Sequence, residues 1–303
     1  MNVEDACEKF LDYCARERHL APNTIAAYRQ DLIEFRCHFP GRDVGEIVGD
    51  ELVAYSQHLA STRRLAPATI KRRLACLRAM FSRLVRQRAV RESPFASVDL
   101  RIRIPTRLPR CLGAADVGAL MRATERACET TRLTAVLLFA TGVRVSELAA
   151  VRVEDVDLEQ RSLRIFGKGS RERQVFLPND GIVAQVRAYV AARHQSGMPS
   201  DGLLINARGR PISSSSLRNR IKALAKTAGL IQRVTPHVLR HTAATALMES
   251  GVDIRFVQRL LGHQSIATTQ IYTHVSDVAL RTAIVSANVL SRFGSPTGAA
   301  IVA

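Results

Sequence analysis

The chain contains no tryptophan, and aromatic residues make up only 5% of its 303 residues. Proteins that bind single-stranded nucleic acid stack the bases on aromatic side chains, so this scarcity argues against such a platform. No apolar run reaches the length of a membrane-spanning helix, and Met1–Lys9 lacks the apolar stretch of a secretory signal. We therefore expect a cytoplasmic protein with no membrane partner.

The cysteines also lack a recognisable motif. None of the six forms a CxxC pair, and none lies beside a histidine at the spacing of zinc ligands. We expect reduced thiols, as in a cytosolic protein, and no metal site. Positive charge, in contrast, is abundant. The formal net charge of +17 favours a polyanionic partner, nucleic acid first.

Hydrophobic spacing predicts two regions of helix. The first contains four helices, over residues 3–18, 23–39, 49–61 and 68–88. Residues 93–110 are rich in proline and arginine, which is typical of an extended basic linker. Helices resume at residue 111 and are interrupted by a β-hairpin with strands Ser162–Phe166 and Arg173–Leu177. The expected domains are therefore 1–92 and 111–303.

Two of the predicted helices begin with nearly the same residues. Leu20–Ile25 and Leu65–Ile70 share the pattern Leu-Ala-Pro-X-Thr-Ile. Proline suits the first turn of a helix. The repeat indicates either two similar caps, as an old duplication would leave, or two helix N-termini directed at DNA phosphates. The sequence does not separate these alternatives.

The fourth predicted helix is strongly basic. Every charged residue between Arg63 and Arg91 is lysine or arginine. On a helical wheel, the residues opposite the apolar stripe are Lys71, Arg72, Arg78, Arg83 and Arg86. Solvent-exposed faces usually mix both signs of charge, so we favour contact with DNA over a merely solvated face. The residues predicted to contact DNA are Thr24, Arg29, Thr69, Lys71, Arg72, Arg73 and Arg78.

Candidate reactive residues occur in four segments of the second region. Arg144 follows Gly142, a predicted helix end, and Thr141 or Ser146 is expected to cap the next helix. Lys168 lies in the turn of the β-hairpin. Taken singly, each has an ordinary structural interpretation, because Arg144 can form an ion pair within its own helix and a turn lysine is usually surface.

The third segment begins a helix with Thr235 and Pro236, so His237 and Arg240 share a face near the positive helix N-terminus. The fourth segment contains His263 and Tyr272, which are unremarkable in isolation. Combined with the other segments, they form a distinctive set. Two arginines can bind phosphate oxygens bidentately, two histidines and a lysine can transfer protons, and a tyrosine hydroxyl can attack phosphorus.

The motifs Thr141–Leu148, Gly167–Gly169, Pro236–His241, Leu261–His263 and Thr268–Val275 resemble, in order and spacing, the active-site motifs of the tyrosine recombinase family. Bacterial Xer-type and mobile-element integrases are especially similar. The resemblance implies a mainly α fold, with a SAM-like four-helix core-binding domain and an α+β catalytic domain that carries a small β-sheet. Together these domains are expected to form a C-shaped clamp on DNA.

The resemblance also implies roles. Tyr272 would attack the scissile phosphate and form a 3′-phosphotyrosyl link, without metal or ATP. The other implied catalytic residues are Arg144 and Arg240 for the phosphate charge, Lys168 for the 5′-oxygen leaving group, His237 for the tyrosine proton and His263 for a non-bridging oxygen.

The implied partners are a double-stranded DNA site and either three further copies of the chain or a partner recombinase, on a bacterial nucleoid. Chromosome or plasmid resolution and mobile-element integration both stay open. A type IB topoisomerase shares the chemistry, and a DNA-binding protein that has lost catalysis is a second alternative, which the complete residue set disfavours. An apolar helix over residues 277–293 is expected to dock on a neighbouring protomer or, less favoured, to cover its own core.

Overall fold

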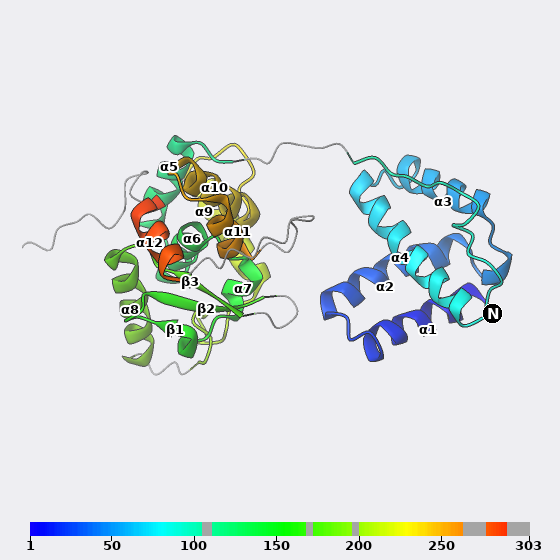
Figure 1. The fold of residues 1–303 in the computed structure, drawn as a ribbon, viewed down its shortest axis with the longest axis horizontal. Coiled ribbons are helices and arrows are strands. Elements are labelled where there is room, and N and C mark those ends of the chain that lie inside the picture. The colour runs from blue at the N-terminus through cyan, green and yellow to red at the C-terminus, as the bar shows by residue number, and fades with distance from the viewer. Residues whose placement is uncertain (105–110, 168–171, 196–199, 263–276, 290–303) are drawn as a thin grey trace, which may run out of the picture. The chain divides into compact units, whose positions relative to one another are not determined.

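The computed structural model describes residues 1–104, 111–167, 172–195, 200–262 and 277–289 (Figure 1). The chain divides into two compact units, Met1–Arg107 and Leu108–Ala303. Both are built mainly of helices, and the second contains a small β-sheet, which confirms the expected fold class. No helix in these described residues is long and apolar enough to cross a membrane.

The first unit contains the four predicted helices. They are α1 (Val3–Arg16), α2 (Pro22–His38), α3 (Gly49–Ser61) and α4 (Pro67–Arg86). Aromatic rings fill the centre, where Phe35 packs edge-on against Tyr55 and Phe81 with ring centroids 5.5 and 6.3 Å away. Rings in this arrangement stabilise a core beyond their buried area alone. The helix bounds lie within two residues of those predicted from hydrophobic spacing.

The two similar helix starts belong to a repeated helical hairpin. Leu20 N donates to Cys14 O, and Leu65 N donates to Leu59 O, 45 residues later, both at 3.0 Å. The residue before each leucine is left-handed, with φ of 46° at His19 and 49° at Arg64. The turn between α1 and α2 and the turn between α3 and α4 therefore have the same backbone structure, as two similar caps require.

Part of the predicted linker packs on the first unit. Phe95 is buried against Phe81, with ring centroids 6.1 Å apart, and Arg78 of α4 lies over the Phe95 ring at 4.8 Å. Leu100 and Ile102 are partly buried against the same core. The compact part of the first unit therefore continues beyond residue 92.

The second unit surrounds one central helix, α6. Its helices are α5 (Ala114–Thr124), α6 (Glu129–Thr141), α7 (Val145–Ala150), α8 (Asp180–Gln195), α9 (Ser214–Thr227), α10 (Pro236–Glu249), α11 (Ile254–Leu261) and α12 (Asp277–Ala287). Every residue of α6 from Leu133 to Thr141 is buried, and the helix contacts α5, α8, α9 and α10, as expected for a helix that lacks a solvent face along most of its length. Figure 1 shows it at the centre of this unit.

The β-sheet contains three antiparallel strands in the order β1 (Val156–Asp157), β2 (Ser162–Phe166) and β3 (Glu172–Phe176). The register pairs Ser162 with Phe176 and Phe166 with Glu172. The predicted hairpin is confirmed, with β3 one residue earlier than expected. Alternation along β3 points Arg173 and Val175 to the same side, toward the core.

α12 packs against β3 of its own chain. Ile284 and Val289 are buried in the core of the second unit, and Asn288 accepts a hydrogen bond from Asn179 at 3.2 Å. Within this chain, the helix therefore covers its own core, which was the less favoured of the two arrangements expected from the sequence.

Candidate active site

The first part of the site is the junction between α6 and α7. Gly142 ends α6 in the left-handed region, with φ +62°, as predicted. The expected cap by Thr141 or Ser146 is wrong. Glu147 takes this role, because its Oε2 accepts from the backbone N–H of Arg144 at 2.8 Å, while the Thr141 hydroxyl donates to Leu137 O within α6. The junction leaves the Arg144 side chain 43% exposed.

The second part is the start of α10. The Thr235 hydroxyl accepts from Val238 N at 3.2 Å and Pro236 occupies the first turn, as predicted. Arg240, one turn further on, is only 4% exposed. Its two terminal nitrogens donate to Gly142 O at 2.8 Å and to Leu261 O at 2.6 Å. α10 thus presents a buried guanidinium to the α6–α7 junction.

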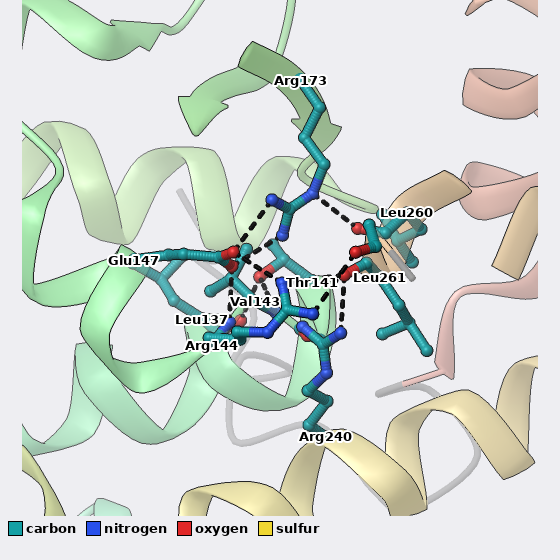
Figure 2. A network of polar contacts seen from close by, with 11 residues as sticks. Leu137, Thr141, Val143, Arg144, Glu147, Arg173, Arg240, Leu260 and Leu261 are labelled. Carbon is teal, nitrogen blue, oxygen red and sulfur yellow. Dashed lines mark hydrogen bonds and ion pairs between the residues drawn. The ribbon is translucent and has the colours of Figure 1, made fainter. Parts of the chain in front are cut away.

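The third part is the C-terminal end of α11, where the two arginines meet. Arg144 donates to Leu261 O at 3.4 Å and to Gly262 O at 3.3 Å, so Leu261 O accepts from both arginines. Figure 2 shows the two guanidinium groups converging on this end of the helix. Carbonyl groups at a helix C-terminus lack partners within the helix and carry partial negative charge, which favours cations there.

The pKa values of Arg240 and Glu147 are both lowered in this cluster. Burial and the nearby charge of Arg144 lower the pKa of Arg240 to about 10. Burial alone would raise the pKa of Glu147, but hydrogen bonds from Arg173 and from the Arg144 backbone outweigh this, so its pKa lies below the ordinary value. Among the described residues, no carboxylate forms an ion pair with Arg240. A buried cation with only carbonyl partners is suited to receive an anion.

Arg173 of β3 belongs to the same cluster, and the sequence analysis did not identify it. Its guanidinium donates to both carboxylate oxygens of Glu147, at 3.1 and 2.7 Å, and its Nε donates to Leu260 O at 2.9 Å. A signal was present in the sequence, because Arg173 occupies an inward position of an alternating strand. A charged residue at such a position needs a buried partner.

The remaining predicted catalytic residues are placed as follows. His237 is exposed in the first turn of α10, three residues before Arg240. Lys168, His263 and Tyr272 lie outside the described residues. The structure therefore brings Arg144 and Arg240 together. Within its described part, it contains no cluster of three or more histidine, cysteine, aspartate or glutamate side chains that could hold a metal ion.

The predicted DNA contacts lie in the first unit. Arg29, Lys71, Arg72 and Arg78 are exposed, and Thr24 and Thr69 are half-buried at the starts of α2 and α4. The guanidinium of Arg72 binds the buried carboxylate of Asp31 in α2, which fixes its direction.

Arg73 departs from the prediction of a DNA contact. It is 7% exposed and forms ion pairs with Asp31 at 3.5 Å and Glu34 at 3.3 Å. The reason is its position on the wheel, since it follows Ile70 by three residues and precedes Leu77 by four, on the apolar stripe. We therefore assign Arg73 to the packing of α4 on α2.

Comparison with known proteins covers nearly the whole chain. Residues 110–278 match the model described as "Phage integrase family", and residues 7–88 match "Phage integrase, N-terminal SAM-like domain". Tyrosine recombinase XerC of Roseiflexus castenholzii is 36% identical over 285 residues, covering 90% of each chain. Tyrosine recombinase XerD of Pseudomonas putida is 36% identical over 282 residues, covering 90% of this chain and 94% of that protein.

A solved structure has the same fold. A lambda integrase tetramer bound to a Holliday junction matches with a TM-score of 0.71 and 19% sequence identity, over 89% of this chain and 80% of that one. At this identity the likeness concerns the fold alone.

Proposed function

The chain belongs to the phage integrase family of tyrosine recombinases, and from this premise we propose that it cuts and rejoins duplex DNA at specific sites through a covalent bond to Tyr272. One observation carries the assignment of the site. Two arginines from distant parts of the chain, Arg144 and Arg240, donate to the same carbonyl oxygen of Leu261. They form a dicationic pocket for one phosphate.

The chemistry follows from the residues assigned to this pocket. The Tyr272 hydroxyl attacks phosphorus, the bond from phosphorus to the 5′ oxygen breaks, and a 3′-phosphotyrosyl link forms. His237 accepts the tyrosine proton, and Lys168 donates a proton to the departing 5′ oxygen. Tyrosine ordinarily has a pKa of about 10, so it needs the nearby cations to react at neutral pH.

Arg144 and Arg240 act on charge that develops at phosphorus. In the transition state, negative charge grows on the non-bridging oxygens, and guanidinium groups already fixed by backbone carbonyls stabilise it without reorganising. His263 donates a further hydrogen bond to one of these oxygens. The energy of the broken bond stays in the phosphotyrosine, so a free 5′ hydroxyl from another strand reverses the step and completes strand exchange.

The first unit supplies affinity for DNA in this proposal. Lys71, Arg72 and Arg78 are exposed on α4, and Arg29 on α2, while Thr24 and Thr69 lie at the two repeated helix starts. Each phosphate that such residues neutralise releases counterions, so binding should weaken steeply with salt. We assign residues 1–92 to core DNA binding, 93–110 to a basic connection whose first part packs on that domain, and 111–303 to catalysis.

The assembly we propose is a tetramer on two DNA duplexes, or a mixed complex with a partner recombinase. Strand exchange between two duplexes needs four cleavage sites, and the lambda integrase structure of similar fold is a tetramer on a Holliday junction. The proposed location is the bacterial cytoplasm, on the nucleoid. The proposed role is Xer-like resolution of chromosomes or plasmids, or integration and excision of a mobile element.

The test is to trap the covalent intermediate. The protein is incubated with fragmented DNA of its source organism, protein–DNA adducts are isolated after denaturation, and sequencing of their junctions identifies the cleaved site. We expect adducts with the wild-type chain and none with Tyr272→Phe, which should still bind the recovered site. An adduct that persists in Tyr272→Phe would disprove the nucleophile assignment. Two marked copies of the site should then yield recombinant joints, whereas relaxation of supercoils alone would indicate a topoisomerase.

A further inference from the structure

Arg173 is a half-buried cation, and its partners in the described part of the chain, Glu147 and Leu260, belong to the candidate active site. Its side chain is 13% exposed, and that of Glu147 is 5% exposed. The pairing is bidentate, and the Nε of Arg173 is committed to the Leu260 carbonyl at 2.9 Å. Only a planar guanidinium can bind a carboxylate and a third acceptor in this way, because the lysine ammonium is a single point charge.

Glu147 connects Arg173 to Arg144. The oxygen Oε1 accepts from Arg144 at 2.8 Å and from Arg173 at 3.1 Å, so one carboxylate lies between two guanidinium groups. Without Arg173, hydrogen bonds from Arg144 would remain to oppose the burial of Glu147, so the pKa of this carboxyl group would rise. The two bonds from Arg173 also fix the direction of the carboxylate that binds Arg144.

Arg173 also fixes the end of α11. The three last carbonyls, of Leu260, Leu261 and Gly262, each accept from an arginine of the cluster. Gly262 has φ +63°, and a Cβ there would lie 3.3 Å from the Arg173 guanidinium, so glycine gives this arginine its close approach.

We propose that Arg173 is a positioning residue for strand cleavage, acting through Glu147 on Arg144 and through the Leu260 carbonyl on the end of α11, whose next carbonyls bind Arg144 and Arg240. Arg173 does not itself contact the phosphate in this proposal. The inference rests on the proposed function, because it takes Arg144 as a ligand of the scissile phosphate. Figure 2 shows the arrangement, with Arg173 approaching from the strand and Arg240 from the opposite side.

The experiment compares single-turnover cleavage in full-length variants. The substrate is a nicked duplex that carries the site recovered from the wild-type adducts, and the readout is the rate of covalent adduct formation. Arg173→Met removes the charge and keeps the alkyl chain, whereas Arg173→Lys keeps the charge and loses the three-way geometry. The matched control is Arg164→Met. Arg164 lies on the adjacent strand β2, is 43% exposed and pairs with Asp155 at 3.0 Å, away from the cluster.

We expect both Arg173 variants to form adducts about 10²-fold more slowly than Arg164→Met, the scale of a misplaced reacting group. Their affinity for the duplex should match that of the control. Equal rates in Arg173→Met and Arg164→Met would overturn the proposal. If Arg173→Met does not fold, Arg173→Lys decides, and failure of both variants to fold would assign a purely structural role and overturn it as well.

A double variant separates positioning from general stability. If Arg173 acts through Glu147, the combined loss in Glu147→Gln, Arg173→Met is smaller than the product of the two single losses. Losses that multiply fully would contradict action through Glu147. Failure of the proposed function gives another result, since the wild-type chain would then form no adduct and no rate could be compared.

Discussion

Replacing Arg240 with lysine tests the dicationic pocket most directly. The fall in the pKa of Arg240 to about 10 has burial as its main cause and the Arg144 charge as its second. A shift of this size corresponds to about 3 kcal/mol of unfavourable free energy for the charged form. An anionic phosphate bound beside Arg240 would offset part of this unfavourable free energy. A poorly solvated cation at this position therefore favours phosphate binding.

Lysine at this position loses the geometry and part of the charge. It cannot donate simultaneously to Gly142 O and Leu261 O in the arrangement of the guanidinium, and loss of one such donor typically lowers a rate about 10²–10³-fold. An ordinary lysine has a pKa of about 10.4, and the burial and neighbouring positive charge at this position would lower the pKa of a lysine here below that value. The charged groups around it would be Arg144, Glu147 and Arg173.

The assay is single-turnover adduct formation on the nicked duplex between pH 6.5 and 9. We expect Arg240→Lys to be about 10²–10³-fold slower than wild type at pH 7. The rate of Arg240→Lys relative to wild type should fall further toward pH 9, because a lysine with a lowered pKa loses its proton more readily than the arginine. Arg233→Lys, at an exposed position just before α10, is the control and should match wild type. A near-normal rate in Arg240→Lys, or a ratio independent of pH, would refute the reasoning.

Three further predictions concern the frame of the site and the first unit. Gly142→Ala should slow cleavage and lower the melting temperature, because residue 142 has φ +62° and a Cβ there would lie 2.8 Å from a methyl group of Leu261. An unchanged cleavage rate and melting temperature would contradict this close packing. Arg73→Met should destabilise the full chain by about 3 kcal/mol in urea unfolding, because it removes one partner of the buried carboxylate of Asp31 and one of the half-buried Glu34. Weaker DNA binding at unchanged stability would instead support Arg73 as a DNA contact. Burial, and then the charge of His58, lower the pKa of His38, so the unfolded chain binds more protons than the folded chain below about pH 6.5 and the melting temperature should fall there. His38→Gln should make the melting temperature less dependent on pH in this range, and an unchanged slope would argue against a role for His38.

Features with a local cause were predicted well from the sequence. Helix bounds follow from hydrophobic spacing, and α3 begins and ends where expected. Gly142 and Thr235 mark their helix ends because left-handed backbone and N-terminal capping depend on single residues. The motifs around Arg144 and Arg240 were found for the same reason, since each motif is short and continuous.

Features that depend on distant partners were not predicted. Arg73 was counted with the basic residues of α4, although the carboxylates that bury it lie about forty positions earlier in α2. Arg173 was assigned only to a strand, because nothing nearby in the sequence indicates that Glu147 lies opposite. The cap at the start of α7 was assigned to the hydroxyl groups of Thr141 or Ser146. Glu147 instead caps this helix start and also binds Arg173.

The acceptors at the end of α11 are main-chain atoms, and this has an evolutionary consequence. A carbonyl oxygen is the same whichever amino acid bears it, so exchange of one apolar side chain for another at the buried positions 260 and 261 leaves the acceptors for the arginines in place. Position 262 is restricted further, through its left-handed backbone. Diverging descendants of this chain could thus repack the core beside the pocket and still inherit its charge arrangement.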